Sequence, residues 1–179
     1  MIEVLSTNIS EVKLIKPKIY EDKRGYFFES YNEKEFFQKM GNINFIQDNQ
    51  SKSSYGVLRG LHFQKKPYEQ AKLVRVLNGE ILDVAVDIRK NSKTFLQHVK
   101  VKLSAQNNYQ LFIPEGFAHG FIVLSKEATV MYKINNIYSP ESDAGYRYDD
   151  PSFKIDWILN EEDIILSEKD LSLPHINDI

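Results

Sequence analysis

The sequence predicts an all-β fold, either an antiparallel sandwich or a closed barrel of the jelly-roll type, with a few short helices. Short segments that alternate apolar and polar residues follow one another, with turn-forming residues between them. These segments are residues 72–88, 98–103, 109–113, 120–125 and 128–134. The chain of 179 residues has no repeats, low-complexity tracts or linkers, which predicts a single domain over residues 1–179.

One helix and a capping motif are marked by local signals. Asn32 is the expected N-cap of a helix, Glu35 follows three residues later, and Gly41 ends the pattern. The tail from residue 156 onward predicts a loop with short helical turns. Within it, Ser167 and Asp170 have the spacing of a capping box.

The pair Asn78-Gly79 predicts a hairpin. A two-residue turn there sets Val74 opposite Asp83 and divides both strands between two faces. One face carries Lys72, Val74, Val76, Ile81, Asp83, Ala85 and Asp87. The other, expected to pack between sheets or subunits, carries Leu73, Arg75, Leu77, Leu82, Val84, Val86 and Ile88. Lys72, diagonal to Asp83 on the first face, fits the wall of a polar cavity and, equally, a solvated face with an incidental ion pair.

Composition excludes several classes of function. The chain is 42% hydrophobic and 27% charged, and its net charge of −2 predicts no bulk attraction to nucleic acid or anionic membrane. It has no cysteine, which excludes disulfides, thiolate zinc sites and cysteine nucleophiles. Residues 1–17 lack an apolar signal-peptide core, and no apolar run has membrane-spanning length. A cytoplasmic protein is expected.

Two histidine-bearing segments stand out: "GVLRGLHFQ" (56–64) and "IPEGFAHGF" (113–121). Their spacings, G-x5-H and P-x-G-x-x-H, resemble the two motifs of the cupin superfamily. In metal-binding cupins the first motif continues as H-x-H, whereas Gln64 stands at the second position here. An amide is a poor transition-metal ligand, and His62, His119 and Glu69 make an incomplete set. No metal site is therefore predicted.

His62 remains as a general base or as a hydrogen-bonded core residue. Imidazole suits a base because it titrates close to neutral pH. Gly60 marks a bulge that would let Arg59 and His62 face the same space. Burying many polar groups without a purpose is costly, which favours function. The groups expected together are Arg59, His62, Gln64, Lys72, Asp83 and His119.

A wider set of segments carries a more specific resemblance. "DKRGYFFESYN", "FIQDNQSKS", "GVLRGLHFQ", "KLVRVLNGEILDVAVDIRKNSKTF", "IPEGFAHGF", "YKINNIYSPESDAGYRYDDP" and "LSEKD" run nearly end to end. Together they resemble the dTDP-4-dehydrorhamnose 3,5-epimerase family of non-metal cupins. The resemblance implies a cupin-type barrel and epimerisation at C3 and C5 of dTDP-4-dehydro-6-deoxy-D-glucose. The C4 ketone acidifies both carbons, so the reaction needs a base, an acid and an oxyanion stabiliser, and no cofactor.

The resemblance also implies roles for individual residues. His62 would be the base, Tyr132 the acid, and Asp170 the partner that orients His62. Lys72 would stabilise the enolate oxygen. Arg59 and His119 would contact the substrate, and Asp83, from the register argument, would support Lys72 or His119. Read locally, Tyr132 is an ordinary core tyrosine and Asp170 belongs to a capping box.

For the nucleotide, the resemblance implies one group around thymidine and diphosphate: Arg24, Glu29, Gln47, Asp48, Asn49 and Lys169. Tyr138 would stack on the nucleotide. Read locally, residues 22–29 are a charged turn that leads into a strand. Asp143 replaces the family's usual glutamate, so its nucleotide contact would be shorter or lost, and Ile158 replaces a usual proline after Trp157.

Other functions stay open at this point. A 3-epimerase, a 5-epimerase or a 3,4-ketoisomerase would act on a related nucleotide sugar. A metal cupin is disfavoured by Gln64, and a non-catalytic sugar-binding module leaves His62, Lys72 and Tyr132 without a joint purpose. The resemblance also implies a homodimer in which N-terminal residues are exchanged between the subunit sheets.

Overall fold

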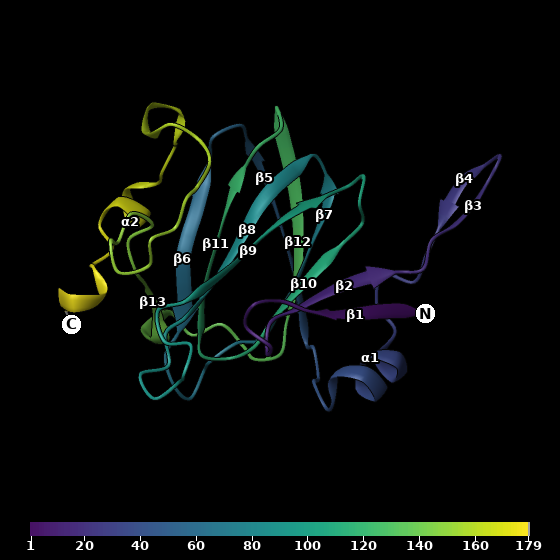
Figure 1. Cartoon of the computed structure of the whole chain (residues 1–179), viewed down its shortest axis with the longest axis horizontal. Helices are drawn as coiled ribbons and strands as arrows, with labels where there is room; N and C mark the ends of the chain where they lie inside the picture. The colour runs from purple at the N-terminus through teal and green to yellow at the C-terminus, as the bar shows by residue number, and fades with distance from the viewer. Residues whose placement is uncertain (179) are drawn as a thin grey trace.

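In the computed structural model, which describes residues 1–178, two antiparallel sheets face each other (Figure 1). One sheet has six strands in the order β1 (Ile2–Ser6), β2 (Lys13–Pro17), β10 (Gln110–Ile113), β7 (Lys72–Asn78), β12 (Glu127–Ile134) and β5 (Gln47–Ser54). The other has five, in the order β13 (Asp143–Gly145), β6 (Leu58–Gln64), β11 (Phe117–Val123), β8 (Glu80–Asp87) and β9 (His98–Ser104). The predicted all-β class is confirmed.

The hairpin predicted at Asn78-Gly79 is wrong. β7 and β8 belong to different sheets, so the chain passes from one sheet to the other at this turn. β7 pairs with β10 and β12, while β8 pairs with β11 and β9. A local turn signal fixes where the chain reverses but not which strands pair. Here strands from distant segments pair with both edges of β7 and of β8, and the inner faces of β7 and β8 meet in the core.

The division of these strands into two faces nevertheless holds. Val74 and Val76 of β7 meet Ile81 and Ala85 of β8 in the core between the sheets. Lys72 and Asp83 share this inward face, so they approach across the barrel and not as cross-strand neighbours. The strand period of two therefore predicted the cavity wall correctly even though the pairing was wrong.

Much of the outward face is covered by the chain's own terminal segments and not by the opposite sheet, while Leu77 of β7 stays 38% exposed. Leu82, Val84 and Val86 pack under Phe153 and Trp157 of the C-terminal segment. On the six-stranded sheet, Leu73 packs in one cluster with Phe36 of α1 (Glu33–Met40). Figure 1 shows α1 beside β1 and β2, and the C-terminal segment along β6 on the opposite side of the molecule.

The helical elements are short, and the two that follow Asn32 and Ser167 begin at the caps that the local signals predicted. The side chain of Asn32 accepts from the Glu35 amide at 3.2 Å, and α1 ends at Gly41. The tail contains η2 (Glu161–Asp163), α2 (Glu168–Leu171) and η3 (Ile176–Asp178), and η1 (Pro140–Ser142) precedes β13. Within residues 1–178, no helix has the length and apolar character needed to cross a membrane.

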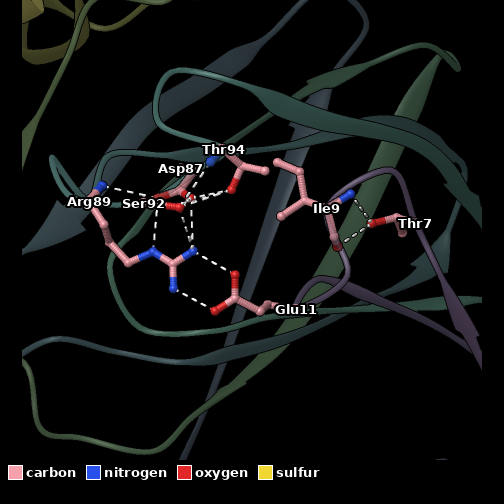
Figure 2. Close-up of polar contacts among 7 residues, drawn as sticks. All are labelled: Thr7, Ile9, Glu11, Asp87, Arg89, Ser92 and Thr94. Carbon is pink, nitrogen blue, oxygen red and sulfur yellow. Dashed lines mark hydrogen bonds and ion pairs between the residues drawn. The ribbon is translucent and has the colours of Figure 1, made fainter.

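A polar network fastens the loop between β1 and β2 to the end of β8 (Figure 2). The buried Asp87 carboxylate accepts from Arg89 Nε at 2.9 Å, Ser92 Oγ at 2.5 Å and Thr94 Oγ1 at 2.6 Å. Arg89 also donates to both carboxylate oxygens of Glu11, each at 2.7 Å. Burial raises the pKa of Asp87, but these hydrogen bonds outweigh it and hold that pKa well below its usual range.

Replacing Asp87 by Asn is expected to lower the free energy of unfolding by about 3 kcal/mol, because Arg89, Ser92 and Thr94 lose a shared buried acceptor. Since the folded-state pKa of Asp87 is depressed, the stabilisation is present at neutral pH and is lost as the pH falls through the acid range. Urea unfolding at pH 7 measures the effect. The matched variant Glu11→Gln, at a half-exposed position, should cost less than about 1 kcal/mol. Equal losses in the two variants would contradict the account.

Candidate active site

A cavity opens between the two sheets and consists of two adjoining hollows of about 360 and 320 Å³. Four side chains line both hollows: His62, Lys72, Tyr132 and Lys169. The outer hollow is completed by Gln47, Asn49, Phe63, Gln64, Gln70, Ile134, Tyr138 and Asp143. The inner hollow is completed by Ser51, Arg59, His119, Phe121, Ser167 and Asp170.

A bulge in β6 aims two of these side chains into one space, as the sequence predicted. β6 takes three steps from Arg59 to His62 while β11 takes two from Phe121 to His119, so β6 carries one extra residue. Gly60 lies in the bulge with φ of 131°, and a Cβ there would stand 2.5 Å from the Cα of Gly120. Glycine is therefore required, and Arg59 and His62 both line the inner hollow.

His62 and Asp170 form a close pair. His62 Nε2 lies 2.5 Å from Asp170 Oδ1, and Asp170 is 4% exposed at the third position of α2. Burial raises the pKa of Asp170, but hydrogen bonds from His62 and Ser167 outweigh it, and the net shift is downward. An ionised carboxylate can only accept, so Nε2 carries a proton, and in the neutral form of the imidazole it is Nδ1 that has the free lone pair. The pairing of Asp170 with His62 is present, and the capping box is present in part: Ser167 Oγ accepts from the Asp170 amide, while the Asp170 carboxylate accepts from the Ser167 hydroxyl in place of the Ser167 amide.

A second histidine–aspartate pair lies deeper. His119 Nε2 is 2.7 Å from Asp83 Oδ1, and both side chains are buried. Burial lowers the pKa of His119, and the positive charge of Lys72 lowers it further, against the pull of Asp83. His119 is therefore neutral at pH 7. The other oxygen of Asp83, Oδ2, is buried and has no hydrogen-bond partner among the described residues.

Lys72 and Tyr132 line both hollows, and burial shifts their pKa values in opposite directions. Burial lowers the pKa of Lys72 to about 8, although Asp83 and Asp143 oppose the shift. Burial also raises the pKa of the Tyr132 phenol, with Arg59 opposing, so the phenol keeps its proton at neutral pH. The cavity thus holds a cation that titrates near neutrality and a proton donor within reach of the same space.

The outer hollow is closed by contacts around Asp143. Its Oδ2 accepts from Tyr138 Oη at 3.1 Å and from Lys169 Nζ. The Lys169 hydrogen bond, together with the charge of Asp143, raises the pKa of Lys169. Although it is one methylene shorter than glutamate, Asp143 still holds both partners at the mouth of the cavity.

Three residues expected near the nucleotide do not line the cavity of this chain. Asp48 alternates with Gln47 and Asn49 along β5, so it points to the opposite side, where Lys133 Nζ lies at 2.8 Å. Arg24 is paired with Asp22 in the two-stranded arm of β3 (Tyr20–Asp22) and β4 (Gly25–Phe27), which projects from the body (Figure 1). Glu29 contacts Asn32 and the N-terminal amine.

Sequence reasoning missed what the Gln64 side chain does, and it did not place at the cavity Ser51, Phe63, Gln70, Phe121, Ile134 or Ser167. The Gln64 amide donates to the carbonyls of Tyr68 and Ile137, each at 3.0 Å, and accepts from the Ser139 amide at 2.7 Å. It therefore ties the loop after β12 to β6, a structural use for the position where metal cupins carry a ligand. Ser167, which lines the inner hollow, was noticed only as a helix cap.

The barrel and this arrangement of paired histidine, lysine and tyrosine define a cupin-type isomerase. The model of the dTDP-4-dehydrorhamnose 3,5-epimerase family matches residues 6–178. A dTDP-4-dehydrorhamnose 3,5-epimerase of Shigella flexneri is 52% identical over 170 residues, covering 94% of this chain and 93% of that protein. The chain therefore belongs to the dTDP-4-dehydrorhamnose 3,5-epimerase family.

Solved structures agree. The Legionella pneumophila 3,5-epimerase in complex with dTDP-4-keto-L-rhamnose is 49% identical, with a TM-score of 0.96 and coverage of 100% of this chain and 95% of that one. A 3'-monoepimerase of Streptomyces bikiniensis in complex with dTDP-quinovose is 30% identical, with a TM-score of 0.88 and coverage of 96% and 87%. The same fold therefore supports epimerisation at one centre as well as at two.

Proposed function

We propose that this chain converts dTDP-4-dehydro-6-deoxy-D-glucose to dTDP-4-dehydro-L-rhamnose by epimerisation at C3 and C5, without a cofactor. The observation that carries the proposal is the placing of His62 and Tyr132 on opposite sheets, with both side chains lining both hollows. A base on one wall and a proton donor on the other are what inversion at carbon requires. The identity to 3,5-epimerases over most of the chain supports the same reaction.

The proposed mechanism uses each group once per centre. His62 Nδ1 removes a proton next to the C4 ketone, and Asp170 stabilises the imidazolium that forms. The electron pair moves onto the ketone oxygen, where the Lys72 ammonium stabilises the enolate. Tyr132 then delivers its phenolic proton to the opposite face of the carbon, and before the second centre reacts the tyrosinate regains a proton from solvent while the His62 imidazolium gives its proton up to solvent. Arg59 and His119 border the same hollow and would contact the sugar, and the charge of Asp83 supports Lys72 and His119.

The fall of kcat/KM at high pH is expected to follow the deprotonation of Lys72. Because burial lowers its pKa to about 8, kcat/KM should fall as the pH rises above this value and the ammonium loses its charge. The variant Lys72→Met should lower kcat roughly 100- to 1,000-fold, in the range found for loss of an oxyanion donor, and should remove this fall at high pH. Initial rates from pH 6 to 10 measure both. If kcat/KM of Lys72→Met still fell above pH 8 in the same way, the fall would belong to the titration of another group.

The nucleotide would occupy the outer hollow, with Lys169 near the diphosphate and Tyr138 against the base. Gln47, Asn49 and Asp143 complete that end. We propose a homodimer in which the partner subunit supplies the equivalent of Arg24 from its arm and the equivalent of Glu29 from the segment that follows the arm, since neither residue lines this chain's own cavity. The arm exposes Tyr26 and Phe27 at 59% and 66%, which favours a covering partner. Sedimentation equilibrium tests this: a mass near the 20.9 kDa of one chain would contradict the dimer.

The placing of Asp48 is harder to reconcile with a nucleotide contact. Its side chain faces the outer side of the six-stranded sheet, so only a partner subunit's nucleotide could reach it.

A single epimerase domain over the whole chain is supported by the family match over residues 6–178. A cytoplasmic location fits a nucleotide-sugar substrate.

Product identity tests the double epimerisation. The enzyme is incubated with dTDP-4-dehydro-6-deoxy-D-glucose, and a rhamnose-forming reductase with its nicotinamide cofactor is added to follow product. Steady reductase turnover that yields a dTDP-linked rhamnose, identified by NMR, supports the proposal. A C3 epimer or a 3-keto sugar, identified by NMR, would instead favour a monoepimerase, like the Streptomyces bikiniensis relative, or a 3,4-ketoisomerase.

A further inference from the structure

The carboxylate of Asp170 is held at both of its oxygens. Oδ1 meets His62 Nε2 at 2.5 Å, and Oδ2 accepts from the hydroxyl of Ser167 at 2.7 Å. The same hydroxyl oxygen accepts from the backbone amide of Asp170 at 3.1 Å. A helix cap requires only this last contact, in which the serine oxygen receives a backbone N–H. The hydroxyl proton is thus directed at the carboxylate in addition to the capping role.

We propose that Ser167 is a positioning residue for the His62–Asp170 pair: its hydroxyl fixes the rotation of the carboxylate so that Oδ1 stays in line with the imidazole. This inference rests on the roles proposed above for His62 and Asp170. The Asp170 side chain has two torsions, and His62 restrains only one oxygen. With Ser167 on the other oxygen, both ends of the carboxylate are restrained before substrate arrives, which is the preorganisation that base catalysis needs.

The electrostatic surroundings make this hydrogen bond consequential. Asp170 is buried, and the hydroxyl of Ser167 is one of the donors that lower its pKa against burial. The charged and titratable groups around the inner hollow are Arg59 and His62 on β6, Lys72 on β7, His119 on β11, Tyr132 on β12 and Lys169 on α2. None of the hydrogen bonds found for the described residues joins Asp170 to these groups except that of His62. Among the described residues 1–178, Ser167 is therefore the one side chain besides His62 that hydrogen-bonds to the Asp170 carboxylate.

The variant Ser167→Ala tests the proposal. We expect kcat to fall roughly tenfold, as for loss of an outer partner that orients a reacting group, while KM changes by less than about twofold. The acid limb of kcat/KM should move to higher pH, because the carboxylate loses a donor and the His62–Asp170 pair then binds its proton more tightly. Ser167→Thr should restore both kcat and the limb, since threonine also caps and donates, and this exposed site has room for its methyl group.

Two control variants separate positioning from helix capping. Ser172→Ala removes a hydroxyl on the same segment that donates to the Lys169 carbonyl at 2.9 Å, and Asn32→Ala removes the cap of α1. Neither should shift the acid limb. A limb in Ser167→Ala that stays in place or moves to lower pH would overturn the proposal, as would failure of Ser167→Thr to restore it. Turnover that survives in His62→Asn would instead overturn the proposed function, so the two failures are distinguishable.

Discussion

His62→Asn is expected to abolish epimerisation, with kcat reduced by at least about 1,000-fold. Asparagine has nearly the shape of the imidazole but has no basic nitrogen at neutral pH, so no group remains on the five-stranded sheet to remove the proton. His119 is not expected to replace His62, because it lies deeper in the cavity: its side chain is 7% exposed, against 32% for His62. The measurement is product formation by NMR at substrate saturation.

Binding provides the control for this variant. The nucleotide end of the cavity is formed by other residues, so the dissociation constant for dTDP, measured by calorimetry, should change by less than about threefold. Loss of turnover with intact binding also excludes a non-catalytic sugar-binding module. Substantial turnover in His62→Asn would mean that a different group is the base.

Tyr132→Phe is expected to separate proton removal from inversion. His62, Asp170 and Lys72 remain, so the enolate still forms, but the opposite wall has lost its proton donor. In D₂O, deuterium should then enter the substrate with its original configuration while product formation falls roughly 100-fold or more. NMR of the recovered substrate shows both effects.

The contrast between these variants carries the assignment of roles. His62→Asn should lose exchange and inversion together, whereas Tyr132→Phe should keep exchange and lose inversion. Phenylalanine keeps the ring in its half-buried place, so the barrel should unfold at nearly the same temperature. If Tyr132→Phe lost exchange as completely as His62→Asn, Tyr132 would be acting before the enolate forms.

Local signals predicted the elements they control. Asn32 and Gly41 bound α1 as expected, because capping depends on residues three or four positions apart. The period of two in β7 and β8 placed Lys72 and Asp83 on the inward face. Strand pairing was beyond such reasoning at Asn78-Gly79, because it is decided by competition among segments far apart in the chain.

In the candidate site, too, local patterns predict some features, while others depend on distant parts of the chain. The strand period could have excluded Asp48 from the cavity, since Gln47 and Asn49 on either side of it point inward. The pairing of His62 with Asp170 spans 108 positions, and no local pattern contains it; only the family resemblance indicated it. The proposed contact of Arg24 with a nucleotide would depend on a second subunit, which the pattern of one chain does not encode.

The most direct test of double epimerisation is NMR of dTDP-4-dehydro-6-deoxy-D-glucose with the wild-type enzyme in D₂O, following the hydrogens on C3 and C5 separately. The account predicts enzyme-dependent loss of both signals and a product inverted at both carbons. Exchange confined to one carbon would contradict it and define a single-centre epimerase or a ketoisomerase.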